Sequence, residues 1–355
     1  MKHSLLFLAV CAICFSATAQ TRWYPGYELG LGGKVLQTEN PYHRADTSRY
    51  PFVGNVVNLV RCSAGLTLHF KTNSKSIQLQ PEYGFIYSGR TTNMLSIMGF
   101  DMYIRQNGKW MWASAAVPKK GREDKPVTLI SDMDGSEHEC LIYLPIYAEL
   151  RSLQVGLDEG ATMRPCKPDS DFRLVAHGSS FTMGVSTSRA GMGYPQQMAR
   201  RTGLNVLGFG MSGNCKLQPA FAQALADAEF DALLLDTFSN PTIGEINERL
   251  FPFIEKVQSA HPGIPLIFQR TIYRESGNYN LKKRAEEARR IQVADSLMSI
   301  ACKRYKDVYY IYPNATGKEH ETSVDGTHPG DYGYKLWEQS IEKKVLRILK
   351  KYGYK

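Results

Sequence analysis

The strongest candidate for chemistry is a run of small polar residues in the middle of the chain, His177-Gly178-Ser179-Ser180. It follows the apolar run 172–176 and precedes a segment with helical character from about Tyr194. A strand that turns sharply into a helix places a hydroxyl at the carboxyl edge of a sheet, beside N–H groups that favour negative charge. Ser180 is therefore a candidate nucleophile if a base can reach it. Taken alone, the same run is typical of a Ser/Gly turn that caps a helix.

A second group of reactive side chains lies far down the chain, in Asp325-Gly326-Thr327-His328. An imidazole beside a hydroxyl can accept its proton, and a carboxylate on the other ring nitrogen fixes the tautomer and stabilises the imidazolium. Two further polar runs, Ser212-Gly213-Asn214 and Ser239-Asn240-Pro241, contain groups that can donate hydrogen bonds to an oxyanion.

From residue 171 onwards the chain alternates apolar and helical segments. Five apolar runs predict strands, at 172–176, 205–209, 232–238, 265–271 and 308–312. Helical patterns follow them, at 194–201, 219–228, 243–260, 280–305 and 332–351. Apolar strands joined by helical crossovers indicate an α/β fold with a parallel sheet covered on both faces. The four polar runs follow the first, second, third and fifth strands, and parallel strands all end at one edge of their sheet.

Gathered at that edge, these residues are of the types that acyl transfer through a serine requires. Ser180 would attack, His328 would act as general base and Asp325 would orient the imidazole. The oxyanion donors would be the backbone N–H groups of Ser180 and Gly213 and the side-chain amide of Asn240. Each has another explanation alone, because Gly213 suits a turn, Asn240 an Asx turn and Asp325 a cap. Their joint occurrence favours a catalytic set.

The first half of the chain has a different pattern, dominated by short alternating segments. Strands are predicted at 66–70, 76–80, 102–105, 110–113, 139–147 and 152–157. Asn107-Gly108 separates two of them and is a strong hairpin signal. Short strands with turns between them indicate an all-β sandwich. We therefore expect a β-sandwich domain at 20–165 and an α/β domain at 171–355.

Residues 1–19 have the pattern of a secretory signal peptide, with a basic start, an apolar run and Ala17-Thr18-Ala19 before Gln20. We expect cleavage after Ala19 and export to the periplasm or the extracellular space. The alternative is a lipoprotein acylated at Cys11, although Val10 is a poor residue before an acylated cysteine. No later segment has the length and continuity of a membrane helix.

Charge and cysteine usage argue against several other classes of protein. The net charge of +9 is dispersed, and the densest basic run, 282–290, is interleaved with Glu286 and Glu287. This pattern favours a solvated helix face over nucleic-acid binding. The cysteines beyond the signal segment form no CxxC pair; they are Cys62, Cys140, Cys166, Cys215 and Cys302. Buried free thiols are favoured over a single disulfide, and neither a metal nor a cofactor is expected.

With these residues in place, the chain resembles the SGNH/GDSL hydrolase superfamily. The four blocks of that superfamily occur in order at Ser180, Gly213, Asn240 and His328. More closely, the chain is similar to two-domain bacterial GDSL esterases whose N-terminal β-sandwich carries a Gly-x-Asp-Leu-Tyr signature, here Gly99-Phe100-Asp101-Met102-Tyr103. The resemblance implies a serine esterase with a flavodoxin-like hydrolase domain of five parallel strands. It also implies a jelly-roll-like sandwich that packs on this domain and shapes the mouth of its site.

Other segments also fit the pattern of these esterases, at 188–192, 212–217 and 325–329. Three positions depart from it. Ser179 stands where the subfamily typically has Thr, and Met102 stands where it has Leu. The block around Asn240 often reads Gly-x-Asn-Asp in the superfamily, whereas Phe238-Ser239-Asn240-Pro241 lacks both flanking residues.

The sequence restricts the substrate less sharply. The superfamily splits acetyl, aryl, lipid and sugar esters, and no long apolar lid segment of the kind that suits a lipase is evident. Export, the appended sandwich and many aromatics favour a short-chain ester, mainly O-acetyl, on a polysaccharide or oligosaccharide; the aromatics are Tyr83, Tyr87, Trp110 and Trp112. Trp110 and Trp112 share one strand face, where core or interface packing is favoured over sugar stacking.

Peptidoglycan O-acetyl esters are a further substrate of the same reaction class. Two other functions stay open on the same fold. An acyltransferase would use the same Ser180 acyl-enzyme. A non-catalytic carbohydrate-binding protein would keep the fold but could do without Ser180, His328 and Asp325. The sequence contains no signal for an oligomeric state.

Overall fold

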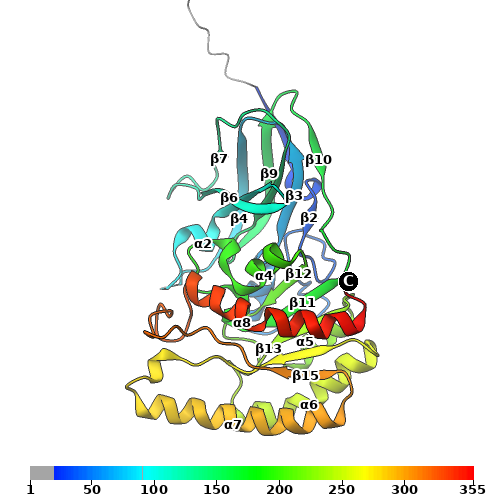
Figure 1. Cartoon of the computed structure of the whole chain (residues 1–355). Helices are drawn as coiled ribbons and strands as arrows, with labels where there is room; N and C mark the ends of the chain where they lie inside the picture. The colour runs from blue at the N-terminus through cyan, green and yellow to red at the C-terminus, as the bar shows by residue number, and fades with distance from the viewer. Residues whose placement is uncertain (1–19, 90) are drawn as a thin grey trace, which may run out of the picture.

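The structure is a computed structural model that describes residues 20–89 and 91–355. The predicted signal peptide, residues 1–19, lies outside the described residues. In Figure 1 the first half of the chain forms antiparallel sheets at the top, and the second half forms a parallel sheet flanked by helices below.

The first half of the chain folds as two antiparallel sheets. One has the strand order β1-β9-β4-β7, and the other has the order β10-β3-β8-β5-β6 with β2 paired to β3. Their bounds are β1 (Thr21–Pro25), β2 (Leu31–Gly32), β3 (Thr67–Thr72), β4 (Ile77–Ile86), β5 (Phe100–Gln106), β6 (Lys109–Ala116), β7 (Val127–Ile130), β8 (His138–Tyr143), β9 (Ala148–Asp158) and β10 (Met163–Pro165). Alternate residues of both sheets, among them Leu68, Leu79 and Val155, share one core. The expected β-sandwich is confirmed.

Two strand predictions in this region have different outcomes. The hairpin is confirmed, because Asn107 and Gly108 both have positive φ (50° and 74°), as a type I′ turn needs. The strand expected at 139–147 is wrong at its end, because β8 stops at Tyr143 and β9 begins at Ala148. Ile146 and Tyr147 are instead buried in the core shared with the second half of the chain, so their apolar character reflects interdomain packing.

The second half of the chain forms a parallel sheet with the strand order β12-β11-β13-β14-β15. Its strands are β11 (Arg173–Gly178), β12 (Asn205–Gly210), β13 (Ala232–Asp236), β14 (Leu266–Gln269) and β15 (Val308–Ile311), which match the five predicted. This order is the flavodoxin-like one, with its switch point between β11 and β13. The predicted α/β fold is confirmed.

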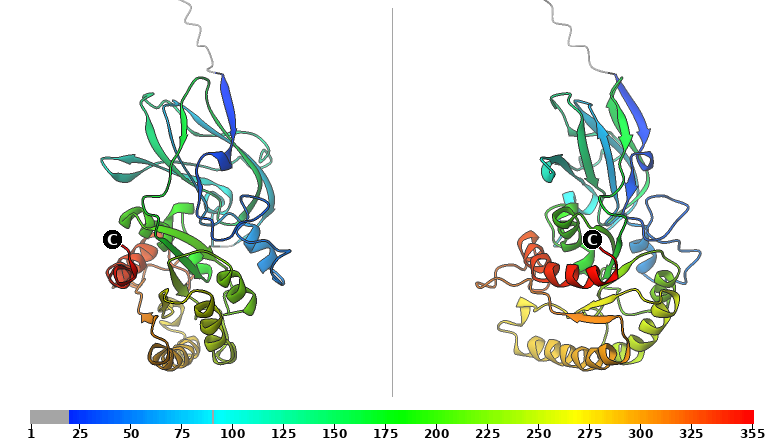
Figure 2. Two further views of the ribbon diagram at one scale, coloured as in Figure 1. Left: turned by 90° about the vertical axis from the view of Figure 1, so that its right-hand side faces the viewer. Right: turned by 45° about the vertical axis from the view of Figure 1, so that its right-hand side comes forward.

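Helices cover both faces of this sheet (Figure 2). On one face lie α4 (Tyr194–Thr202) and α8 (Asp331–Leu349); on the other lie α5 (Pro219–Ala226), α6 (Ile243–Ala260) and α7 (Leu281–Arg304). Strand β13 explains the continuous apolar runs, because Leu234 joins the core under α4 and α8 while Leu233 and Leu235 join the core under the other helices. The described residues also form three short α-helices that the sequence did not predict, because one or two turns are too short to show a helical hydrophobic period. They are α1 (Val56–Arg61), α2 (Met94–Met98) and α3 (Ser180–Met183).

Surface and cysteine predictions are mostly confirmed. The basic run at 282–290 lies on the exposed side of α7, except that Glu287 and Arg290 turn inward. All five described cysteines are free; Cys62, Cys140 and Cys215 are buried, Cys166 is partly exposed, and Cys302 is exposed, contrary to expectation. Among the described helices, none combines the length and the apolar character needed to cross a membrane.

The two halves of the chain meet around a buried arginine. Arg44 is 2% exposed, and its guanidinium donates to the carbonyl oxygens of Leu59 (2.5 Å), Cys62 (2.9 Å) and Gly210 (2.8 Å). Gly210 ends β12, so this contact ties the first half of the chain to the edge of the parallel sheet. Burial lowers the pKa of Arg44 to about 10, which leaves it charged at neutral pH.

A buried histidine joins β11 and β12, the strands that precede the polar runs of Ser180 and Gly213. His177, on β11, donates from Nδ1 to the Phe209 carbonyl on β12 (2.9 Å), and the Cys215 thiol donates to its Nε2 (3.5 Å). Burial lowers the pKa of His177 to about 4 and raises the pKa of the Cys215 thiol well above its ordinary value. Both groups are therefore neutral at physiological pH, and the pair is a structural contact.

Replacing Arg44 by Ala should lower the free energy of unfolding by about 3 kcal/mol, because three carbonyl oxygens lose their donor and a cavity opens between the domains. Urea unfolding followed by circular dichroism measures the change. Arg49→Ala is the matched control, since the Arg49 side chain is 61% exposed, pairs with Asp227 and lies 5.5 Å from the Tyr50 ring centroid; a change within about 0.5 kcal/mol is expected there. Equal effects of the two substitutions would contradict the structural role of Arg44.

Lowering the pH from 6.5 to 4 should destabilise the fold through His177. In this window the unfolded state binds a proton that the native histidine, with its depressed pKa, does not bind, so stability rises with pH across it. The contribution is at most about 3 kcal/mol. Urea midpoints measured at several pH values should show a shallower dependence for His177→Gln, whereas exposed His320→Gln should keep the parent slope. An unchanged slope in His177→Gln would refute the assignment.

Candidate active site

The turn that carries Ser180 is built by a glycine and a capping serine. Ser180 begins α3, and the Ser179 hydroxyl oxygen accepts from the Phe181 N–H (3.2 Å) as the N-cap. At Gly178 an added Cβ would lie 2.1 Å from Thr182 Oγ1, so only glycine lets the strand and the helix approach so closely. Ser180 is 6% exposed and lies at the carboxyl edge of the sheet, as expected.

A buried carboxylate that the sequence analysis missed holds this turn in place. Asp236, the last residue of β13, accepts at Oδ2 from the N–H (3.1 Å) and hydroxyl (2.6 Å) of Ser179 and from the Thr182 hydroxyl (3.2 Å). Its Oδ1 accepts from the Ser239 hydroxyl (3.1 Å). Burial raises the pKa of Asp236, and these hydrogen bonds oppose the shift. The signal was present in the sequence, as a lone carboxylate that ends an apolar strand.

The structure brings Ser180, His328 and Asp325 into one hydrogen-bonded chain. The Ser180 hydroxyl donates to His328 Nε2 (2.9 Å), and His328 Nδ1 donates to Asp325 Oδ2 (2.8 Å). Asp325 Oδ1 also accepts from the backbone N–H groups of His328 (2.7 Å) and Thr327 (2.9 Å). Burial alone would raise the pKa of Asp325, but the hydrogen bonds from His328 and Thr327 outweigh it and hold the pKa below its ordinary value. This is the arrangement that general-base activation of a serine needs.

A neighbouring loop supports the His328 segment. The His328 carbonyl oxygen accepts from the Ser323 hydroxyl (3.1 Å) and from the Val324 N–H (2.8 Å). Glu275, in the short helix Glu275–Gly277, accepts from the Ser323 N–H (3.2 Å). The Phe181 ring packs 5.5 Å from the His328 ring. The imidazole is therefore held both along its loop and against the helix that carries Ser180.

The expected oxyanion donors lie in adjoining loops of the same edge. In the described part of the chain, neither the Ser180 N–H nor the Gly213 N–H has an acceptor. Gly213 has a φ of 69° with open space around it, so the backbone conformation explains the glycine. The Asn240 side-chain oxygen accepts from the Cys215 N–H (3.2 Å), which joins the two loops and leaves the Asn240 NH₂ group as a donor.

Two arginines behind Asn240 were also missed. Arg274 and Arg290 both donate to the carbonyl oxygen of Ser239 (2.8 and 2.7 Å), the residue before Asn240. Glu287 pairs with both guanidinium groups (3.1 and 3.3 Å). Nothing in the sequence pattern separates Glu287 and Arg290 from the other charges of α7, or marks Arg274 in the loop after β14, because only tertiary packing brings them together at the sheet edge.

The signature of the first half of the chain also reaches this edge. Asp101 is fully buried and accepts at Oδ2 from the Gly191 N–H (2.9 Å), and its Oδ1 pairs with Arg189 Nε (3.0 Å). The N–H of the neighbouring Ser188 donates to Asp331 (2.8 Å), three residues after His328. A carboxylate of the sandwich thus fixes the segment that contacts the start of α8.

The aromatic residues singled out from the sequence lie in separate places. The Tyr83 hydroxyl donates to the Met98 carbonyl inside the sandwich (2.6 Å). Tyr87 is 38% exposed and its ring lies 5.1 Å from Tyr147, whose hydroxyl donates to Ser212 Oγ beside Gly213 (2.9 Å). Trp110 is half-buried between the domains, as expected, whereas Trp112 is 55% exposed and reaches the second half of the chain through Arg189 (5.3 Å).

Sequence comparison places both halves of the chain in known families. Residues 171–347 match the GDSL-like Lipase/Acylhydrolase family, and residues 21–163 match the GxDLY domain, the N-terminus of SGNH-hydrolase-type esterases. No curated protein matches the chain.

Several solved structures are similar over nearly the whole chain, among them a lipase, an acyltransferase and a carbohydrate esterase. A GDSL-like lipase from Bacteroides ovatus is 34% identical, with a TM-score of 0.88, covering 93% of this chain and 98% of its own. The salicylyl-acyltransferase SsfX3 from a tetracycline biosynthetic pathway is 18% identical, with a TM-score of 0.70 and coverage of 93% and 98%. A family two carbohydrate esterase from Cellvibrio japonicus is 11% identical, with a TM-score of 0.59 and coverage of 94% and 99%. The last two structures share only their fold with this chain. The family matches and the Bacteroides structure establish that this chain belongs to the GDSL-like lipase/acylhydrolase family, with an N-terminal GxDLY domain.

Proposed function

We propose that the protein is an exported serine esterase that hydrolyses short-chain acyl esters, chiefly O-acetyl esters, on carbohydrates. The observation that carries this proposal is the hydrogen-bonded chain from Ser180 through His328 to Asp325. The position of Ser180 at the start of α3, beside unpaired N–H groups in the described structure, supports it further.

The geometry supports a two-step mechanism. His328 takes the Ser180 proton as the hydroxyl oxygen attacks the ester carbonyl, and the ionised Asp325 stabilises the resulting imidazolium. The carbonyl oxygen becomes an oxyanion that accepts from the N–H groups of Ser180 and Gly213 and from the Asn240 amide. His328 then gives its proton to the departing alcohol, which leaves an acyl-Ser180 ester. Water, activated by His328, attacks that ester and regenerates the free serine.

An alcohol with many hydroxyl groups suits the surroundings of the candidate site. A hollow beside the His328 loop is lined mainly by polar side chains of both domains; they are Thr91, Thr92, Asn93, Ser186, Ser188 and Asp331, with Val324. The Ser186 hydroxyl is buried without a partner among the described residues, at a φ of 66° that a serine rarely adopts. The hydroxyl, amide and carboxylate groups of this lining can form hydrogen bonds with the hydroxyl groups of a sugar. The fold shared with a carbohydrate esterase is in keeping with this substrate class.

Acyl transfer is the second candidate, favoured by the fold shared with an acyltransferase. A sugar hydroxyl held in the same hollow would replace water in the second step. Product analysis with an added acceptor sugar separates the two reactions, since transfer yields a new ester and hydrolysis yields the free acid. A non-catalytic binding protein is disfavoured, because it would have no use for the hydrogen-bonded chain at Ser180.

Replacing Ser180 by Ala should abolish hydrolysis of p-nitrophenyl acetate and release of acetate from acetylated xylan, because the nucleophile is lost. Absorbance of p-nitrophenolate and enzymatic assay of acetate measure the two activities. Ser296→Ala, at an exposed serine of α7, is the control and should keep full activity. Equal activity of Ser180→Ala and the parent would refute the proposal, and activity confined to long-chain esters would refute the carbohydrate substrate.

Asn240→Ala should lower kcat by about 10²–10³-fold with little change in KM, because an oxyanion donor acts mainly in the transition state. Steady-state kinetics with p-nitrophenyl acetate measures both constants. Asn247→Ala is the control, since that amide lies exposed on α6 and donates to its own helix. A raised KM with unchanged kcat would assign Asn240 to substrate binding instead.

A further inference from the structure

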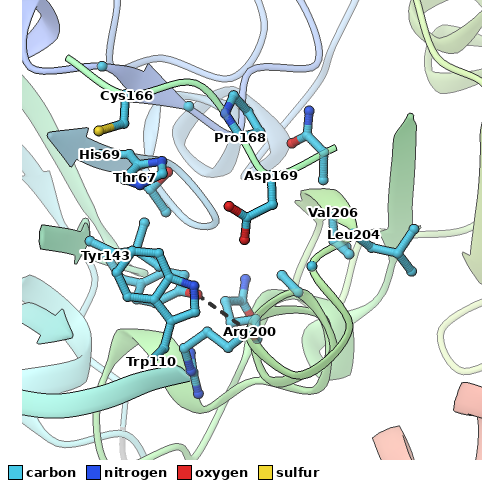
Figure 3. Close-up of a pocket in the computed structure, with 18 of the residues that line it drawn as sticks. Thr67, His69, Trp110, Tyr143, Cys166, Pro168, Asp169, Arg200, Leu204 and Val206 are labelled. Carbon is cyan, nitrogen blue, oxygen red and sulfur yellow. Dashed lines mark hydrogen bonds between the residues drawn. The ribbon is translucent and has the colours of Figure 1, made fainter. Parts of the chain in front are cut away.

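A second cavity lies between the two domains, away from the candidate active site (Figure 3). Its volume is about 320 Å³. Leu204, Asn205 and Val206 line it where β12 begins, so it opens at the amino edge of the parallel sheet, whereas Ser180 follows the carboxyl end of β11. Its wall also includes three other parts of the chain: the sandwich, the interdomain linker at 166–169, and helix α4.

One wall of the cavity is aromatic. His69 of β3, Trp110 of β6 and Tyr143 of β8 lie side by side there (Figure 3). The guanidinium of Arg105 lies 4.3 Å from the Trp110 ring centroid without lining the cavity, and the His69 ring meets the indole nearly edge-on at 5.4 Å. The indole is therefore held in position from two sides while it still contributes to the cavity wall.

Polar groups converge on the same space. The Asp169 carboxylate points into the cavity, as Figure 3 shows, and is oriented by Arg105 (2.5 Å). Arg200 enters from α4; its Nη1 donates to the Gly191 carbonyl (2.7 Å), and its guanidinium lies 5.3 Å from the Tyr143 ring centroid. The hydroxyl-bearing Thr67 completes the polar lining from the sandwich side.

We propose that this cavity binds a single sugar residue. A flat, braced indole packs well against the C–H face of a pyranose ring, and an adjacent carboxylate and guanidinium can bond its hydroxyl groups. The volume lies at the lower end of the range for small-ligand pockets, which commonly form at domain interfaces. Asp169, the one carboxylate among the described residues that line the cavity, is already paired with Arg105, so the lining gives a cationic ligand no unpaired partner.

This site would act independently of the proposed chemistry. Its ligand would contact the sandwich, the linker and α4 together, so occupancy would stabilise the joined domains by mass action. Binding should therefore raise the temperature of unfolding and should survive when the candidate active site is blocked.

The test is isothermal titration calorimetry of the purified protein with a panel of methyl β-D-glucopyranoside, methyl β-D-xylopyranoside, methyl β-D-galactopyranoside and N-acetyl-D-glucosamine. At least one probe should bind and raise the unfolding temperature. Trp110→Ala and Asp169→Asn should each weaken binding by about tenfold or more. Trp112→Phe is the matched control on the same strand, since Trp112 is exposed and does not line the cavity; its affinity should equal that of the parent.

Two further measurements locate the bound sugar and guard against misfolding. Protein whose Ser180 has been blocked by an alkyl phosphonate should bind the probe with unchanged affinity. Circular dichroism checks that Trp110→Ala is folded, and Asp169→Asn, at an exposed linker residue, tests the site without altering the core. The proposal would be overturned if no probe binds, or if both cavity variants bind the sugar as tightly as the parent does. Loss of binding on phosphonylation would overturn it as well.

Discussion

The site at the sheet edge depends on one buried carboxylate. Asp236 ends the central strand β13 and gathers the N–H and hydroxyl of Ser179 together with the hydroxyls of Thr182 and Ser239. A carboxylate removed from water is costly unless donors surround it, so these groups are held to it firmly. Through them one side chain sets the direction of the turn that carries Ser180 and anchors the residue before Asn240. Asp236 therefore supports both the Ser180 hydroxyl and the Asn240 amide, which is one of the proposed oxyanion donors.

The β-sandwich contacts the α/β domain directly at this edge of the parallel sheet. The Arg44 guanidinium reaches the end of β12, and the buried Asp101 side chain reaches the segment beside α8. Arg44 donates to Gly210 of the other domain as well as to Leu59 and Cys62 of its own. Asp101 contacts Gly191 and Arg189 of the other domain, so separating the domains would remove partners from both side chains. Tyr147 adds a hydrogen bond to Ser212, in the loop of Gly213. The Gly-x-Asp-x-Tyr signature thus has a physical role in joining the domains.

Helix α4 links the two ends of the α/β domain. At its start the Tyr194 hydroxyl meets the Thr182 hydroxyl (3.0 Å) next to the turn that carries Ser180, and the Tyr194 ring stacks on Trp337 at 4.7 Å. Toward its other end Arg200 faces the interdomain cavity. The same helix packs against the turn of Ser180 at one end and lines the cavity at the other. The packing of α4 is therefore relevant both to the proposed chemistry and to the proposed sugar site.

The sequence by itself determined the α/β class, the five strands, the Asn107-Gly108 hairpin and the set of Ser180, His328 and Asp325. These were accessible because apolar periodicity marks strands and helices, and because parallel strands must end at one edge, so residue types after successive strands can be read as neighbours. Only the tertiary structure decided the roles of Asp236, Arg44 and Arg290, and the different surroundings of Trp110 and Trp112. Periodicity shows that a face is buried but not what covers it, and contacts across a domain interface depend on how two independent cores meet in space.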